Sequence, residues 1–132
     1  MKPSILHLIE RLGGGVSFVE LCRDIDGFAG PRDCTLHTQV ILWQGVSDAA
    51  IIALDELQQA RQIVLVACRV LVYQLDGKTL HLPVAKRRDY VYKRPRWYPV
   101  ALSTPAQLRT PGSPLRLARR TLGARDHASV PR

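Results

Sequence analysis

The feature that most constrains the fold of this chain is an amphipathic segment, residues 47–61, with the periodicity of a helix. Its apolar side chains recur every three or four residues and form one face, namely Ile51, Ile52, Leu54, Leu57 and Ala60. A stripe of this width must pack against a core. Ser47 or Asp48 is suited to cap the first turn, because each side chain offers an oxygen to free backbone N–H groups. The segment therefore predicts a packed helix within a globular domain.

Two further helices are expected before this one. Residues 4–12 place apolar side chains at helical spacing, and the glycines at 13–15 end the pattern. Ser17 and Glu20 have the spacing of a capping box, in which each side chain bonds the other residue's backbone N–H. The helix that they open is expected to bury apolar side chains, namely Phe18, Val19, Leu21, Cys22 and Ile25.

Residues 63–83 predict an antiparallel hairpin. The segment is rich in β-branched and apolar residues, and Asp76-Gly77 is the strongest two-residue turn signal in the chain. A turn at that point places Tyr73 opposite Leu80. The core face of the hairpin would then hold Leu71, Tyr73, Leu80 and Leu82. A slip of one residue would expose these side chains, so the register is well specified.

The remaining segments are less regular. Residues 26–34 are a loop by composition, and residues 35–43 are open between a strand, from their β-branched content, and a helix, from their position. Residues 97–102 are expected to close the core. We expect a folded domain over 1–102 and a disordered, Arg- and Pro-rich basic tail over 103–132. Residues 115–122 of that tail could form one or two helical turns on a partner.

The order helix, helix, undecided element, helix and hairpin resembles a winged helix-turn-helix domain. Gly45-Val46-Ser47 opens the third helix, which presents Ile51, Leu54 and Leu57, and the hairpin at 63–83 stands where the wing would lie. The resemblance covers residues 4–84. It implies an α+β, winged-helix-like fold, with three helices packed on a small antiparallel β-hairpin or sheet, and a function in DNA binding.

Charge is divided unevenly along the chain. The net charge is +8, yet residues 1–60 hold four basic and eight acidic side chains. Residues 61–100 hold nine basic and two acidic side chains, and residues 101–132 hold six arginines and one acidic side chain. An acidic first half and a basic second half predict an anionic partner for the second half.

Cations and aromatic rings are interleaved in residues 86–99, which read KRRDYVYKRPRWYP and contain four of the eight aromatic residues. Lysine and arginine neutralise phosphates, and aromatic rings stack on bases, so the pattern indicates nucleic acid. The candidate contact residues are Lys86, Arg87, Arg88, Tyr90, Tyr92, Lys93, Arg94 and Arg96. A terminal strand with solvated cations explains the same pattern equally well.

The helix at 47–60 carries three carboxylates, from Asp48, Asp55 and Glu56, and no cation. We therefore do not expect it to read bases in the major groove. We expect a non-enzymatic nucleic-acid-binding module, with DNA ahead of RNA, that uses the basic-aromatic segment and the tail. One alternative is a protein-interaction module that uses the acidic helix, and a third interpretation is a small basic ribonuclease.

The sequence indicates no cofactor or metal site. It contains none of the glycine-rich phosphate-binding or catalytic motifs, and the Cys34–His37 pair lacks the second close pair that a structural zinc site needs. Three cysteines without a Cys-x-x-Cys pair indicate reduced thiols and a cytoplasmic protein. The longest apolar run, residues 63–68, is too short to cross a bilayer, so no membrane partner is expected.

Overall fold

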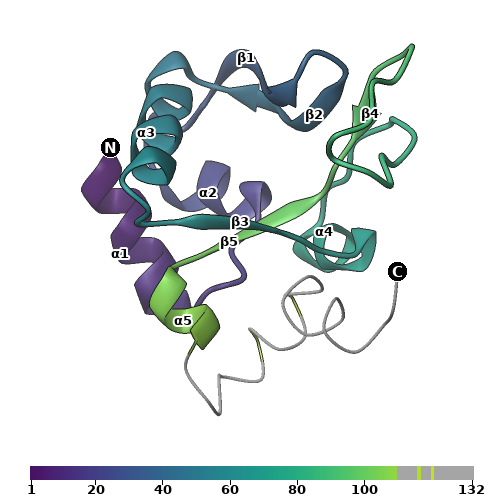
Figure 1. The fold of residues 1–132 in the computed structure, drawn as a ribbon. Helices are drawn as coiled ribbons and strands as arrows, with labels where there is room; N and C mark the ends of the chain where they lie inside the picture. The colour runs from purple at the N-terminus through teal and green to yellow at the C-terminus, as the bar shows by residue number, and fades with distance from the viewer. Residues whose placement is uncertain (110–115, 117–119, 121–132) are drawn as a thin grey trace.

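The computed structural model describes residues 1–109, Arg116 and Arg120, and these form a mixed α+β fold (Figure 1). Within them a three-stranded sheet has the order β1-β2-β4, and a two-stranded sheet pairs β3 with β5. β1–β2 and β3–β5 are antiparallel, whereas β2–β4 is parallel. The elements are α1 Lys2–Leu12, α2 Phe18–Asp24, β1 Ala29–His37, β2 Val40–Val46, α3 Asp48–Gln59, β3 Val64–Ala67, α4 Val70–Asp76, β4 Arg96–Trp97, β5 Val100–Ser103 and α5 Pro105–Arg109.

The three helices predicted in the first half of the chain are confirmed as α1, α2 and α3. Gly13 ends α1 in the left-handed conformation, with φ of 82°. The capping box of α2 is complete, since Glu20 N donates to Ser17 Oγ (3.3 Å) and Ser17 N donates to Glu20 Oε1 (3.1 Å). Ser47 caps α3 by accepting from Ala50 N (3.1 Å). Local capping chemistry therefore sets the starts of α2 and α3.

The undecided segment at 35–43 is strand, and the predicted loop at 26–34 is wrong over most of its length. Residues 29–37 form β1 and residues 40–46 form β2, with a turn at 38–39. β1 is polar and irregular, and only Cys34 within it is buried. It is a strand because it pairs with β2, whose first four residues are all buried. Pairing with a core strand outweighs its own loop-like composition.

The hairpin predicted at 63–83 is wrong. Residues 64–67 form β3 and pair with β5, while residues 70–76 form the helix α4. Gly77 is the left-handed C-cap of α4, with φ of 102°, and its N–H donates to Tyr73 O (2.9 Å). A glycine with positive φ serves a helix C-cap as well as a hairpin turn, so the dipeptide signal was ambiguous.

The α+β class holds, but the winged-helix arrangement is not confirmed. The segment that would have been the first helix of a helix-turn-helix is strand, and the wing hairpin is replaced by α4. Figure 1 shows β3 and β5 crossing the middle of the molecule, with α1 and α5 toward one end and α4 toward the other.

The folded part of the chain continues past the expected boundary after residue 102. Ser103 belongs to β5 and is buried, where its Oγ accepts from Gly15 N (2.9 Å). Thr104 and Gln107 then form a second capping box that opens α5. The tail prediction is therefore wrong for residues 103–109, and most of the remainder lies outside the described residues.

Aromatic rings from separate parts of the chain form the centre of the core. The ring centroid of Trp43 lies 5.0 Å from that of Tyr73, 5.9 Å from Trp97 and 6.4 Å from Phe18. Phe28 packs on Phe18 with centroids 6.1 Å apart. All five side chains are buried. The expectation that residues 97–102 close the core holds at Trp97 and at Val100, Ala101 and Leu102, which are also buried.

Arg61 occupies a conformation that favours glycine. It follows the C-cap Ala60 of α3 and has φ of 58°. Gln62 N donates to Leu57 O (2.9 Å), and Arg61 N donates to Gln58 O (2.9 Å), which is a Schellman motif. We expect Arg61→Gly to raise the free energy of unfolding by roughly 0.5–1 kcal/mol in urea denaturation. Gln62→Gly, made next to it, should not stabilise, and an equal gain from both would contradict the assignment.

Candidate nucleic-acid interface

The basic-aromatic segment forms a closed loop whose two ends are fixed side by side. Ala85 N donates to Trp97 O (2.7 Å), and Trp97 N donates to Pro83 O (2.8 Å). Val84 and Trp97 also form a parallel bridge. Because Trp97 is buried, both ends are anchored at the core. Residues 86–96, called the basic loop from here on, have the length and the adjacent ends of an Ω-loop.

Tyr92 stabilises the conformation of the basic loop through contacts with other residues of the loop. Its hydroxyl oxygen accepts from Lys86 N and Arg87 N, both at 3.1 Å. The Arg96 guanidinium carbon lies 4.8 Å from the centroid of its ring, and the Tyr90 ring packs edge-on against it at 4.8 Å. These are favourable cation–π and aromatic geometries. Tyr92 is therefore engaged within the loop, although the sequence suggested it for stacking on a base.

Residues at the turn between β1 and β2 form hydrogen bonds to the backbone of the basic loop. His37 Nε2 donates to Arg88 O (2.5 Å), and Gln39 Nε2 donates to Lys93 O (3.3 Å). Arg96 N donates to Gln39 O (2.8 Å). The loop backbone is thus tied to one hairpin at three points, so its cations project from a supported frame.

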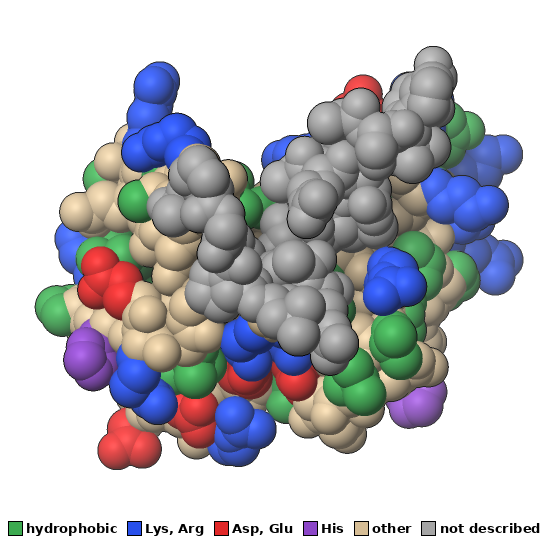
Figure 2. Space-filling model, turned by 90° about the horizontal axis from the view of Figure 1, so that it is seen from below, with side chains coloured by type: hydrophobic (Ala, Val, Ile, Leu, Met, Phe, Trp, Pro, Cys, Tyr) green, Lys and Arg blue, Asp and Glu red, His purple; other side chains and the backbone are tan. Residues whose placement is uncertain are grey.

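Most cations of the basic loop face solvent without a carboxylate partner among the described residues. Five are exposed, namely Lys86, Arg87, Arg88, Lys93 and Arg94, and Arg96 is half-buried. Asp89, the loop's single carboxylate, lies 3.7 Å from Arg87 in a solvated pair, which is a weak contact. In the described part of the chain the other four exposed cations form no ion pair. In Figure 2, blue side chains gather at the right edge, the side where Figure 1 draws β4.

Two apolar side chains stand between these cations. Tyr90 is 50% exposed and Val91 is 82% exposed. The Arg87 guanidinium carbon lies 5.7 Å from the Tyr90 ring centroid, which leaves the ring within reach of solvent. An exposed ring flanked by cations matches the way that proteins hold single-stranded nucleic acid, with cations on phosphates and rings on bases.

A cavity of about 510 Å³ lies beside the first cations of the basic loop. Its lining includes Lys86, Arg87, Arg88, Cys68 and Tyr98. Burial raises the pKa of Tyr98, while the charge of Arg88 acts to lower it. Burial also raises the pKa of the Cys68 thiol to about 12, so this wall is neutral at pH 7. Asp89 adds one carboxylate to the three cations of the lining, so the cavity joins a mainly cationic rim to an uncharged wall.

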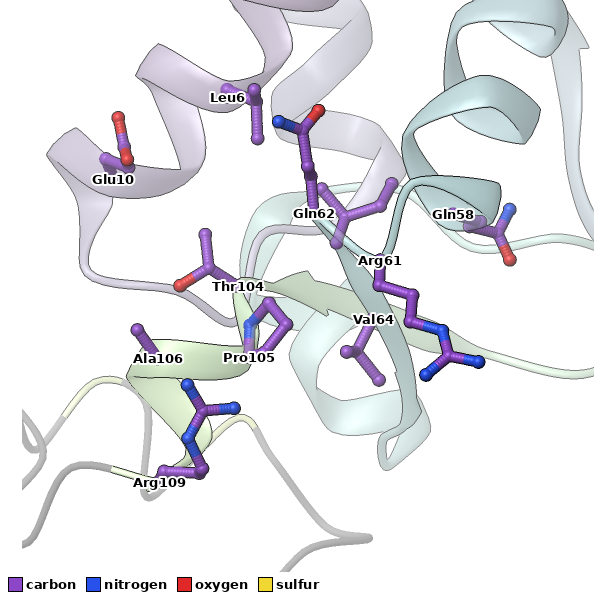
Figure 3. A pocket seen from close by; sticks show the side chains of 11 residues that line it. Leu6, Glu10, Gln58, Arg61, Gln62, Val64, Thr104, Pro105, Ala106 and Arg109 are labelled. Atoms are coloured by element: carbon purple, nitrogen blue, oxygen red, sulfur yellow. The ribbon is translucent and has the colours of Figure 1, made fainter.

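A second cavity, of about 770 Å³, lies between α1, the end of α3, β3 and α5 (Figure 3). Arg61 and Arg109 are its two cations. Figure 3 shows their guanidinium groups on opposite sides of Val64, so they do not converge on one anion. Glu10 adds a carboxylate to the same lining. This cavity is a poorer site for a polyanion than the surface of the basic loop.

The acidic helix α3 is partly neutralised by the chain itself. Asp48 Oδ1 lies 2.8 Å from Arg32 Nε, and Glu56 Oε1 lies 3.1 Å from Lys2 Nζ. Asp55 accepts from Gln59 Nε2 (3.0 Å). Ile52, expected on the core face, is 59% exposed instead. An apolar side chain among carboxylates is a feature that a protein partner could contact.

The remaining candidate chemistry is dispersed. Burial raises the pKa of the Cys34 thiol to about 11, which disfavours the thiolate that a metal would need. His37 is bonded to the basic loop. Across residues 1–109 with Arg116 and Arg120, no three His, Cys, Asp or Glu side chains gather as a metal site. No helix in that same part of the chain is long and apolar enough to cross a membrane.

No protein-family model, curated protein or solved structure matches this chain.

The structure places all eight predicted contact residues in one loop, but it gives them different roles. Tyr92 and Arg96 maintain the loop, whereas Tyr90 and the exposed cations face outward. Val91 and the adjoining cavity were not predicted. Val91 lies between two tyrosines, a pattern equally typical of a strand, and a cavity has no local sequence signal.

Proposed function

We propose that the chain is a nucleic-acid-binding module that holds its ligand with the basic loop. The observation that carries this proposal is the supported loop with five exposed cations, four of which have no ion pair among the described residues. Uncompensated cations at one surface attract polyanions, because contact with phosphates releases condensed counterions. The basic loop, and not the acidic α3, is the interface.

The loop divides the work of binding between its side chains. Lys86, Arg87, Arg88, Lys93 and Arg94 contact phosphates. Tyr90 stacks on an exposed base, and Tyr92 keeps the cations in place through its hydrogen bonds to the loop backbone. Phosphate contacts carry little sequence information, so binding should depend more on charge and strand state than on base sequence.

The test is the salt dependence of binding, measured by fluorescence anisotropy with duplex and single-stranded DNA. Replacing the five exposed loop cations with glutamine should lower the affinity at least about a hundred-fold at low salt. If all five contact phosphates, the magnitude of the slope of log K against log salt should fall by about 4.5 on duplex DNA.

A matched control keeps the total charge equal. It replaces five exposed cations elsewhere with glutamine, namely Arg11, Arg61, Arg69, Lys78 and Arg109. This variant should retain most of the affinity and the slope. Equal losses in the two variants would mean that net charge alone drives binding. A wild-type protein that leaves both DNA probes unbound at low salt would exclude the proposal and leave the acidic α3 with Ile52 as the remaining candidate surface.

A further inference from the structure

A second charged site shares no residue with the basic loop and contains two carboxylates from different elements. Glu20 lies on α2, and Asp76 is the last residue of α4. Ser17 links them, since its N–H donates to Glu20 Oε1 (3.1 Å) and its hydroxyl donates to Asp76 Oδ2 (2.6 Å). The exposed fractions of the two carboxylate side chains are 6% and 11%. Two carboxylates buried this far need a cation beside them.

Two arginines near the end of the chain supply that cation. Arg120 bonds both oxygens of Asp76, and its Nη2 lies 3.3 Å from Glu20 Oε1. Arg116 Nη2 donates to the same Glu20 oxygen (2.6 Å). Paired N–H groups on a carboxylate form the strongest and most directional type of ion pair.

Backbone carbonyls of the glycine turn before α2 complete the contacts. Arg120 Nε donates to Gly15 O (2.7 Å), and Arg116 Nε donates to Gly14 O (3.1 Å). Arg116 Nη2 also reaches Gly15 O (3.4 Å). Each guanidinium group therefore bonds a carboxylate through Nη and a carbonyl through Nε, and a lysine ammonium lacks such separate nitrogens fixed in one plane.

The glycine turn before α2 also lets Arg120 approach its backbone closely. Gly15 has φ of 64°, and a Cβ built on it would lie 2.9 Å from Arg120 Cβ. Arg116 and Arg120 are four residues apart in the sequence, and both guanidinium groups reach the same oxygen of Glu20. Burial acts to raise the pKa of Asp76, but hydrogen bonds from Arg120 and Ser17 outweigh it, and the pKa is lowered. The carboxylate is therefore charged at neutral pH.

We propose that Glu20, Asp76 and the carbonyls of Gly14 and Gly15 form a recognition site for the guanidinium groups of two arginines spaced four residues apart in the sequence. We call it the guanidinium site. Its occupant is the chain's own C-terminal segment, through Arg116 and Arg120. The site thereby holds two of the six arginines that follow residue 100 against the body of the protein.

The first test fills the site in trans. In the full-length Arg116→Gln/Arg120→Gln variant, the site loses its own ligand. A fluorescent peptide with the sequence of residues 112–124 should bind this variant at least about ten-fold more tightly than it binds the wild-type protein, whose site is occupied. A peptide with lysine at both positions should bind at least about ten-fold more weakly than the arginine peptide. Equal binding to the variant and the wild type, or equal binding of the two peptides, would overturn the proposal.

The second test uses limited trypsin digestion of the intact chain, followed by mass spectrometry. Trypsin must take the arginine side chain into its own pocket, so Arg116 and Arg120 should be cut more slowly than the exposed Arg109. Asp76→Asn and Glu20→Gln should speed cutting at 116 and 120 at least about five-fold relative to 109. Glutamine still completes a capping box, so Glu20→Gln keeps that part of α2. Unchanged relative rates in both variants, with thermal unfolding like that of the wild type, would overturn the proposal.

Discussion

Gly30→Ala should lower the free energy of unfolding by about 3 kcal/mol, a large share of the stability of a domain this size. A Cβ on Gly30 would lie 2.5 Å from Ser47 Cα and 2.9 Å from Ser47 N. Real Cβ atoms do not approach backbone atoms so closely, so one of the two segments must move.

Ser47 cannot move without losing several bonds. Its N–H donates to Phe28 O (2.8 Å), and its hydroxyl donates to Gly27 O (2.6 Å). The same hydroxyl caps α3 by accepting from Ala50 N. A shift at this residue therefore disturbs the start of α3 and its attachment to the chain before β1, which is why the expected loss is large.

Urea denaturation followed by tryptophan fluorescence measures this effect, because Trp43 and Trp97 are both buried. Gly77→Ala is the control for backbone strain alone. Gly77 has φ of 102°, yet a Cβ there would meet nothing within 4 Å. It should cost about 1 kcal/mol. If Gly30→Ala costs no more than this control, the close contact with Ser47 does not limit the fold.

Tyr73→Phe should lower the free energy of unfolding by about 3 kcal/mol while changing no carbon atom. The Tyr73 hydroxyl accepts from Phe18 N (3.2 Å) and donates to Val100 O (2.6 Å), and the side chain is fully buried. Phenylalanine leaves a buried N–H and a buried carbonyl without this partner, at about 1–3 kcal/mol each. The hydroxyl joins α2 to β5, so the loss should be cooperative and visible in urea denaturation.

Tyr98→Phe provides the matched control. Tyr98 is half-buried, and within the part of the chain that is described its hydroxyl makes no hydrogen bond. Removing it should change the unfolding free energy by less than about 0.5 kcal/mol. Equal effects of the two substitutions would contradict the role given to the Tyr73 hydroxyl.

Tyr73→Phe should also change how stability depends on pH in the alkaline range. Burial raises the pKa of Tyr73 well above its usual value of 10.0. The unfolded chain releases this proton near pH 10 while the folded chain keeps it, so the stability is present below pH 10 and lost as pH rises above it. Tyr73→Phe removes the part of the alkaline loss of stability that this hydroxyl causes. Cys34 and Cys68, whose pKa values burial raises to about 11 and about 12, still contribute to that loss in the variant.

The exposure of the basic-loop cations was easier to predict than the fold around them. Lys86–Arg88 and Lys93–Arg94 are clusters of charge that any fold must leave near water, so the sequence alone places them at the surface. Their support by His37 and Gln39 could not be predicted, because those hydrogen bonds join residues more than 50 positions apart in the chain. The hydrogen bonds of Tyr92 span only five and six positions, but the sequence suggested this ring for stacking on a base.

In the C-terminal segment, too, some features could be predicted from the sequence and others could not. Its positive charge and its helical spacing at 116 and 120 are readable from the sequence. The contacts of the two arginines with Glu20 and Asp76 could not be predicted, because Glu20 lies 100 residues from Arg120 in the chain. Thr104 and Gln107 did carry a readable signal, the capping box of α5, which the Arg- and Pro-rich composition concealed.

The sequence by itself determined α1, α2 and α3, since helical hydrogen bonds, caps and apolar stripes involve residues only a few positions apart. It also determined where charge concentrates. Only the tertiary structure decided that β1 is a strand and that Asp76-Gly77 ends a helix. β1 gains its structure from a buried partner, and the glycine conformation at 77 fits both outcomes equally well. Pairing between distant segments selected one of them, and that selection has no local signature.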